Sequence, residues 1–202
     1  MIDKEEFLAF ALSNFTRFGS KRFTLDDFAH EMGISKKTIY EHFKNKEELV
    51  QESLFTLINK LRKEFNKSVD EQRTNPILAI IEVYRIGLDS FKSFSPSFIF
   101  GLKKYYPSVY TSLAEFRTKE LNEIIKSLLR SAKEKGHLRS ETNIELFCEL
   151  YLNRLELIIF SSDNLYEQYA VNELVEHIIV NNLRGIVTEE YLKNNNFLMD
   201  IF

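Results

Sequence analysis

Residues 24–49 read TLDDFAHEMGISKKTIYEHFKNKEEL, and the residues that typically start and end helices predict two short helices here, joined by a tight turn. Thr24 followed three residues later by Asp27 is typical of a helix N-terminus. Gly33 suits the left-handed backbone position just past the end of a helix, and Ser35 suits the start of the next one. The turn at 32–35 therefore has the length and the glycine of a helix-turn-helix, whose second helix fits the major groove of DNA.

Residues that start and end helices also occur on both sides of this stretch, and they predict helices along the whole chain. Six Gly and three Pro in 202 residues are too few for the turns of an all-β fold, so we expect an all-α chain of about nine helices. Most expected starts have a capping side chain followed by an acid three residues on or by proline. The expected starts are Asp3, Thr24, Ser35, Asn45, Asn75-Pro76, Ser95-Pro96, Pro107, Thr142 and about Val171. The helix from Pro107 extends to Lys135, and the last helix runs over 171–187.

Composition excludes several classes of protein. One Cys cannot form an internal disulfide, and no apolar run approaches the roughly 20 residues of a membrane span. The charged N-terminus lacks the apolar core of a signal peptide, so we expect a soluble, cytoplasmic protein. The net charge is −3, but residues 33–46 carry four lysines against the single acid Glu41. Such a local basic patch attracts phosphate groups.

Segments 23–29 and 32–49 together resemble the DNA-binding domain of TetR-family transcriptional regulators. The family pattern of Tyr, any residue, His-Phe, two residues, Lys, two residues and Leu occurs at Tyr40, His42, Phe43, Lys46 and Leu49. The resemblance covers about residues 3–60. It implies a helix-turn-helix DNA-binding domain over 1–46 and a helical ligand-binding and dimerisation domain over 47–202, with the fourth helix bridging the two.

The resemblance also implies roles for the helix-turn-helix side chains. Thr24 and Lys46 lie at helix N-termini, where free amides can help to hold a phosphate. Tyr40 and His42 would contact the DNA backbone, and Lys36, Lys37 and Thr38 are the candidate base readers. The alternatives are that Thr24 only caps its helix and that Lys37 is only a solvated charge. The predicted DNA-binding residues are Thr24, Ser35, Lys36, Lys37, Thr38, Tyr40, His42 and Lys46.

Aromatic residues are concentrated at 84–116, where nine occur in 33 residues. They build either a solid core or the wall of a cavity, and the family resemblance favours a pocket for a largely apolar or aromatic ligand. The expected pocket residues are Phe65, Tyr84, Phe91, Phe98, Phe100, Tyr105, Phe116 and Tyr151.

Helices predicted at 144–160 and 171–187 are apolar over wide stripes, so both faces should be buried. The resemblance implies that they pair with their copies in a homodimer, whereas the alternative is burial within one chain. The expected interface residues are Leu152, Leu155, Ile159, Leu174 and Ile178.

Motifs for catalysis or metal binding are missing from the sequence. No Gly-rich phosphate loop, nucleophile elbow or HExxH occurs, and Glu173 with His177 is a weak metal pair. Cys148 lies in an apolar stripe and is expected in the core. We therefore expect no enzyme, cofactor or metal, and predict a homodimeric repressor released from a palindromic operator by a small molecule. An activator, or a helical carrier or interaction protein without specific DNA recognition, is the alternative.

Overall fold

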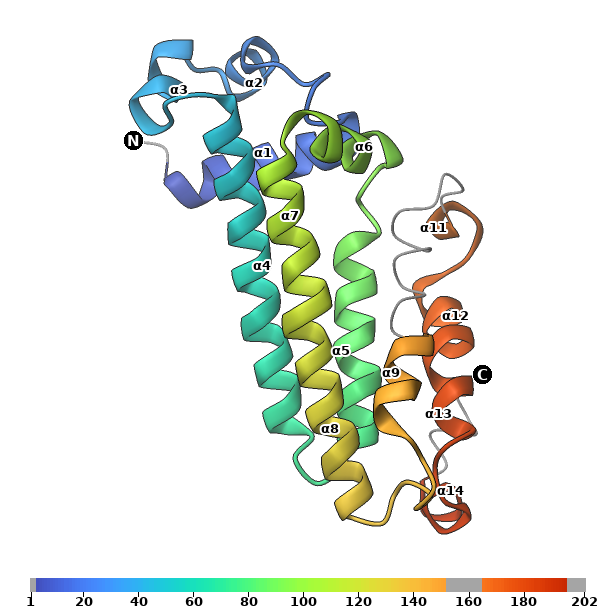
Figure 1. Ribbon diagram of the computed structural model, residues 1–202. Helices are drawn as coiled ribbons and strands as arrows, with labels where there is room; N and C mark the ends of the chain where they lie inside the picture. Colours follow the sequence, from blue (N-terminus) through green and yellow to red (C-terminus); the bar gives the residue numbers. More distant parts are fainter. Residues whose placement is uncertain (1–2, 152–164, 196–202) are drawn as a thin grey trace. The chain divides into compact units, whose positions relative to one another are not determined.

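The computed structural model describes residues 3–151 and 165–195, and both ranges are helical with short connections (Figure 1). No β-strand forms within these ranges, where an isolated antiparallel bridge pairs Leu138 with Val187. The all-α prediction is confirmed. The chain packs as two compact units. The first unit comprises Met1–Lys60 and Ser93–Phe116, and the second comprises Leu61–Lys92 and Arg117–Phe202.

The first unit contains the two short helices predicted around the tight turn. Its helices are α1 (Lys4–Phe18), α2 (Leu25–Met32), α3 (Lys36–His42), the first part of α4 (Lys46–Glu71), α6 (Pro96–Tyr105) and α7 (Pro107–Glu115). Phenylalanine rings fill its core: Phe7, Phe15, Phe28 and Phe43 are at most 2% exposed. The rings of Phe7 and Phe28 stack with centroids 5.4 Å apart. These rings hold the helix-turn-helix against α1.

Predicted capping residues begin the helices of this unit. The Asp3 side chain accepts a hydrogen bond from the Glu5 backbone N–H, and Ser35 accepts one from the Thr38 N–H. Gly33 has φ +65°, the left-handed conformation that the turn requires. The start of α4 is capped by Asn45, whose Oδ1 accepts from the Glu48 N–H at 2.9 Å.

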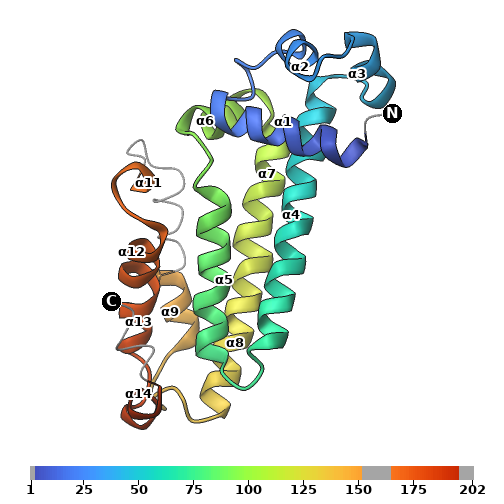
Figure 2. The same ribbon diagram turned by 180° about the vertical axis from the view of Figure 1, so that it is seen from behind.

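The second unit contains the rest of α4, α5 (Pro76–Phe91), most of η1 (Phe116–Leu121), α8 (Asn122–Glu134) and α9 (Ile144–Tyr151). It is completed by α11 (Leu165–Gln168), α12 (Val171–Val175), η2 (Glu176–Val180), α13 (Asn181–Arg184) and α14 (Glu189–Asn194). In this unit α5 packs against α8 and α12, and α8 packs against α9 (Figure 2). Arg62 on α4 donates two hydrogen bonds of 2.6 Å to the Glu120 carboxylate on η1.

Three helix predictions need correction. The helices expected over 107–135 and 171–187 each contain a π-helical segment, η1 and η2 respectively. The helical run expected over 171–187 ends at Arg184, the last residue of α13. The helix expected from Thr142 begins at Ile144, because Asn143 accepts the hydrogen bond from the Leu146 N–H at 3.0 Å and Thr142 lies in the preceding turn.

The polar tail also contains a helix that was not predicted. Thr188 caps α14 by accepting from the Tyr191 N–H. The hydroxyl of buried Tyr191 donates to Asn75 Oδ1 at 2.6 Å. Asn75 also caps α5 by accepting from the Leu78 N–H, and its Nδ2 donates to Asn195 Oδ1 at 3.3 Å. The end of the described chain is therefore fixed to the start of α5.

The two packing units differ from the boundary expected after residue 46. The first unit keeps α4 as far as Lys60 and adds Ser93–Phe116, so α4 contributes residues to both units. The functional division into DNA-binding and ligand-binding domains stays a prediction. Among the described residues, no helix combines the length and apolarity needed to cross a membrane.

Candidate DNA-binding surface

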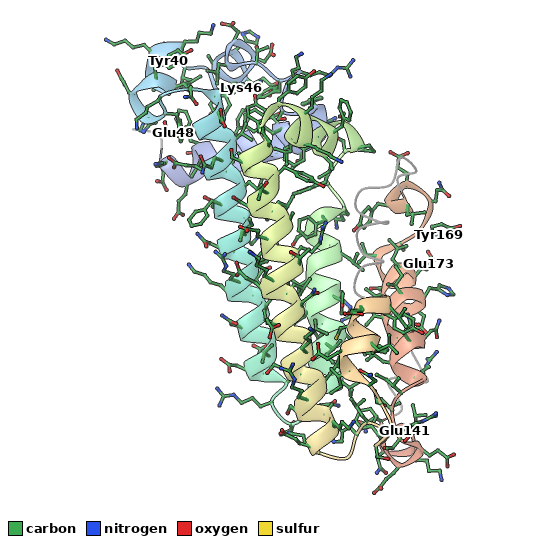
Figure 3. The ribbon with its side chains drawn as sticks, in the orientation of Figure 1. Tyr40, Lys46, Glu48, Glu141, Tyr169 and Glu173 are labelled. Atoms are coloured by element: carbon green, nitrogen blue, oxygen red, sulfur yellow. The ribbon has the colours of Figure 1, made fainter. Side chains whose placement is uncertain are left out.

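Helix α3 is fixed by two apolar side chains and presents its opposite face to solvent. Ile39 on α3 and Phe43 just after it are 1% and 2% exposed. Lys36, Lys37 and Tyr40 are exposed, and Tyr40 keeps 53% of its surface open. Figure 3 shows Tyr40 on α3, with Lys46 at the start of α4. The burial pattern therefore orients a lysine-bearing helix face outward, as recognition of a DNA groove requires.

The two lysines on this face differ in their surroundings. Lys36 Nζ lies 2.6 Å from Asp26 Oδ1, and this hydrogen bond raises the pKa of Lys36. Both side chains are well exposed, so solvent screens the pair and the lysine can exchange partners. Lys37 is exposed on the next position of the helix. This face of α3 thus carries two ammonium groups, and in the free protein that of Lys36 is paired with Asp26.

The hydroxyl residues of the predicted surface serve as helix caps. Thr24 Oγ1 donates to Asp27 Oδ2 at 2.8 Å, and the Thr24 backbone N–H donates to the same oxygen at 2.8 Å. These bonds lower the pKa of Asp27. Ser35 Oγ lies 3.0 Å from Thr38 Oγ1 and accepts from the Thr38 N–H. A phosphate at the start of α2 would therefore lie beside the Asp27 carboxylate, and phosphate binding by Thr24 stays a prediction.

Lys46 and His42 are turned toward the aromatic core. Lys46 Nζ donates to the backbone carbonyl oxygen of Lys21 at 3.3 Å and lies 5.7 Å from the centroid of the Phe15 ring. Burial lowers the pKa of Lys46, and the Asp27 charge opposes that shift. The His42 ring packs 5.2 Å from the Phe7 ring centroid. Of the eight predicted DNA-binding residues, Lys36, Lys37 and Tyr40 thus form the exposed face of α3.

One acidic side chain at this surface was missed, Asp26, which holds Lys36. Glu48, the acid expected three residues after Asn45, accepts a hydrogen bond from the Lys44 backbone N–H in front of α4. Acids in the first turn of a helix are favoured by its dipole, and that signal was present at the start of α2. The sequence does not indicate that Asp26 reaches a lysine of the next helix, because that contact depends on the angle between α2 and α3.

The eight aromatic residues expected around one pocket are divided between the two units. Tyr84 and Tyr151 line a cavity of about 10 Å³ in the second unit, which is room for about one water molecule. Phe65, Phe91, Phe98 and Phe116 are buried. Phe100 is 61% exposed, and Tyr105 is 37% exposed and accepts a hydrogen bond from Lys21 Nζ at 3.0 Å. Phe100 and Tyr105 do not fit an enclosed pocket, because both side chains are exposed to solvent.

A larger cavity of about 280 Å³ lies between α4 and α7 in the first unit. It was not predicted, and it contains none of the expected pocket residues. Its described lining consists of Gln51, Glu52, Leu54, Phe55, Ile58, Val109 and Ser112. The available signal was the adjacent pair Leu54 and Phe55, which puts apolar groups on two sides of α4.

The expected dimer interface is described in part. Leu152, Leu155 and Ile159 lie outside the described residues. Leu174 is 6% exposed within its own unit, and half-buried Ile178 lines the small cavity beside Tyr84. Leu146 and Leu150 on α9 are 50% and 54% exposed. Their spacing of four residues puts them on one side of the helix as an apolar stripe open to solvent.

The remaining titratable candidates have structural roles. The Glu173 side chain accepts from the Ala170 backbone N–H at 2.9 Å and so caps α12 (Figure 3). Cys148 is buried as expected, and burial raises its pKa to about 11. Among the described residues, no three His, Cys, Asp or Glu side chains gather as ligands for a metal ion.

Comparison with known proteins relates both the sequence and the fold to transcriptional regulators. Residues 7–53 match the model of the family described as bacterial regulatory proteins, tetR family. The chain is 25% identical over 169 residues to the HTH-type transcriptional regulator YvaF of Bacillus subtilis, covering 83% of this chain and 87% of that protein.

Two solved structures share the fold across nearly all of their length. The ketosteroid transcriptional regulator KstR2 of Mycobacterium tuberculosis superposes with a TM-score of 0.67 at 17% identity, covering 94% of this chain and 98% of that one. PfmR of Thermus thermophilus, a TetR-family regulator, superposes with a TM-score of 0.69 at 22% identity, covering 90% of this chain and 98% of that one.

Proposed function

Because this chain belongs to the TetR family of bacterial transcriptional regulators, we propose that it is a cytoplasmic repressor whose homodimer binds a palindromic operator and leaves it when a small, largely apolar molecule binds. The observation that carries the proposal is the outward face of α3. Buried Ile39 and Phe43 fix the helix, so that Lys36, Lys37 and Tyr40 face solvent together.

This face suits both parts of DNA recognition. Phosphate contacts position a protein on the duplex, and contacts to base edges in the major groove supply sequence preference. Lys37 can donate to guanine O6 and N7, and Tyr40 can donate its hydroxyl to a phosphate. Lys36 can leave Asp26 for DNA, because both partners are exposed and their attraction is screened by solvent.

A homodimer presents two such helices to one duplex. Two half-sites about one helical turn apart, roughly 34 Å, accept the paired recognition helices of a symmetric dimer. Joining the half-sites raises the effective concentration of the second helix once the first has bound. The exposed stripe of Leu146 and Leu150 on α9 supports association through the second unit, since charged side chains are otherwise typical of a solvated helix face.

Release by an effector needs only different affinities for two states of the protein. A coupling free energy of about 1–3 kcal/mol changes DNA affinity roughly 5–150-fold. Helix α4 supports such coupling, because it begins at Lys46 directly after α3 and contributes residues to both packing units. An effector that prefers one arrangement of α4 would change the population of the DNA-binding state.

Selection of duplexes from a random pool tests the DNA-binding function directly. A regulator of this type selects duplexes that share a palindrome. The logarithm of its affinity for that palindrome decreases linearly with the logarithm of the salt concentration. Recovery of no shared sequence, together with binding that is insensitive to sequence, would instead favour a helical carrier or interaction protein.

A further inference from the structure

The cavity between α4 and α7 has the properties of a small-molecule site. Its volume of about 280 Å³ lies just below the range of pockets that take drug-sized ligands, which begins at about 300 Å³, so it suits a smaller molecule. Leu54, Ile58 and Val109 are at most 3% exposed and form its apolar floor. Phe55 at the same cavity keeps 57% of its surface open, although burying an aromatic ring is favourable. A ligand in this cavity would cover that ring.

The charge at the cavity selects among ligands. Glu52 is acidic, and none of the described residues that line the cavity is basic. The Glu52 carboxylate oxygen lies 2.7 Å from Lys4 Nζ, with about one third of the Glu52 side chain exposed. An anionic ligand would be repelled here, whereas a cation can take the place of Lys4 at Glu52.

We propose that this cavity binds a small apolar molecule that carries a positive charge. Its hydrocarbon part lies against Phe55, Ile58 and Val109, and its ammonium group replaces Lys4 as the partner of Glu52.

The displaced lysine links the cavity to the helix-turn-helix. Lys4 is the first residue of α1, and its Nζ also lies 5.4 Å from the centroid of the Phe43 ring. Phe43 ends α3 and fixes that helix in the core. A cation at Glu52 therefore removes one link between α4 and the start of α1, beside the end of α3. The regulatory consequence rests on the proposed function, whereas ligand binding itself does not.

Titration of the full chain with three related molecules tests the site. 4-Phenylbutylamine is positively charged at neutral pH, 4-phenylbutanol is its neutral counterpart, and 4-phenylbutyrate is its anionic counterpart. Methyl NMR follows Leu54, Ile58 and Val109 at this cavity, with Ile80 and Ile125 reporting on the cavity beside Tyr84. We expect saturable shifts at the first set only, with the amine binding about threefold more tightly than the alcohol, as a solvent-screened ion pair allows. The acid should bind most weakly.

Two variants separate the apolar and charged contributions. Phe55→Ala should weaken the amine and the alcohol about tenfold, because both lose the same ring contact. Glu52→Gln should remove the preference for the amine while leaving the affinity for the alcohol within about twofold, because only the charged ligand loses a partner. Tyr84→Phe, in the second unit, is the control and should change neither affinity. Urea unfolding of each variant verifies that it is folded.

Three results would overturn the proposal: no saturable shift at the cavity methyl groups, equal affinity for amine and alcohol, or amine binding that survives Phe55→Ala unchanged. Operator binding is measured separately on the protein without any of these molecules. Loss of the cavity result with intact DNA binding therefore rejects this site alone. Loss of DNA binding with an intact cavity result rejects the proposed function alone.

Discussion

Lys46 and Lys21 are joined by a hydrogen bond in which the Lys46 ammonium donates to the Lys21 backbone carbonyl oxygen at 3.3 Å. The bond turns the first side chain of α4 back onto the segment between α1 and α2. Burial against Phe15 lowers the pKa of Lys46, so the charged form is less favourable in the folded protein than in the unfolded chain.

The pH dependence of stability should carry the signature of this lysine. In the interval between its lowered pKa and the ordinary value of 10.5, the unfolded chain binds more protons at this site than the folded protein. The contribution of Lys46 to the free energy of unfolding should therefore increase with pH in that interval. Lys46→Met retains the apolar stem and removes the titration. Urea unfolding of both proteins from about pH 8 to the ordinary lysine pKa gives the difference, and identical pH profiles would contradict the burial of Lys46.

Thr24→Ala should destabilise the protein by about 1 kcal/mol, the typical effect of losing a side-chain helix cap. The variant loses the hydroxyl that accepts from the Asp27 N–H and donates to the Asp27 carboxylate. Thr24→Ser keeps both bonds and is the matched control. Chemical unfolding measures the change. Because the capping hydrogen bonds form in the absence of DNA, this loss of stability should be seen in the free protein. An unchanged free energy of unfolding would refute the capping role.

Lys37→Ala should weaken binding to a selected operator by about 1–3 kcal/mol and change the preferred base at one position of each half-site. Lys37 lies on the open face of α3, so its loss should leave the fold intact. Lys103→Ala, at an exposed lysine on α6, is the control for a general loss of positive charge. Repeating the duplex selection with each variant shows the change. Equal losses for the two variants would contradict base recognition by Lys37.

Leu150→Glu should shift the homodimer toward monomers, because it puts a charge into the apolar stripe of α9. Size-exclusion chromatography with light scattering measures the mass. Phe100→Glu makes the same kind of change at a side chain of the first unit that is 61% exposed, and it should leave the mass unaltered. A Leu150→Glu protein that remains dimeric would remove the exposed face of α9 from the interface.

Tyr84→Phe should leave the free energy of unfolding unchanged or raise it by about 1 kcal/mol. The Tyr84 hydroxyl is buried, has no hydrogen-bond partner among the described residues, and has its pKa raised by burial. Tyr191→Phe is the contrasting variant, because it removes the bond to Asn75 and should destabilise by about 1 kcal/mol. Equal effects of the two substitutions would show that the Tyr84 hydroxyl is hydrogen bonded after all.

Local signals predicted much of the fold. Thr24, Gly33, Ser35 and Asn75 act within four residues of themselves, so their capping roles follow from the sequence. The π-helical segments η1 and η2 leave no comparable signal, because inserting one residue into a helical turn depends on how the helix packs. The short helix α14 has a local cap in Thr188, but the contact of its buried Tyr191 with Asn75 joins distant parts of the chain and could not be predicted.

The candidate site was predictable in residue type but not in side-chain direction. The outward face of α3 follows from helical spacing, which buries Ile39 with Phe43 and exposes Lys36, Lys37 and Tyr40. The inward turn of Lys46 depends on Phe15 and on the backbone of Lys21, which lie on other segments. The grouping of aromatic residues at 84–116 was a pattern of local composition, and it could not indicate that Phe98 and Tyr84 belong to different units.

Asn75 bonds simultaneously to the first turn of α5, to Tyr191 and to Asn195, so one amide side chain joins segments separated by more than a hundred residues. On the ribosome, α5 is synthesised long before α14 exists. During that interval the cap of α5 lacks the tyrosine hydroxyl and the Asn195 carbonyl that later hold its amide group. The native environment of this helix start is therefore completed only after Tyr191 and Asn195 have left the exit tunnel, so that the second unit closes later than the synthesis of α5.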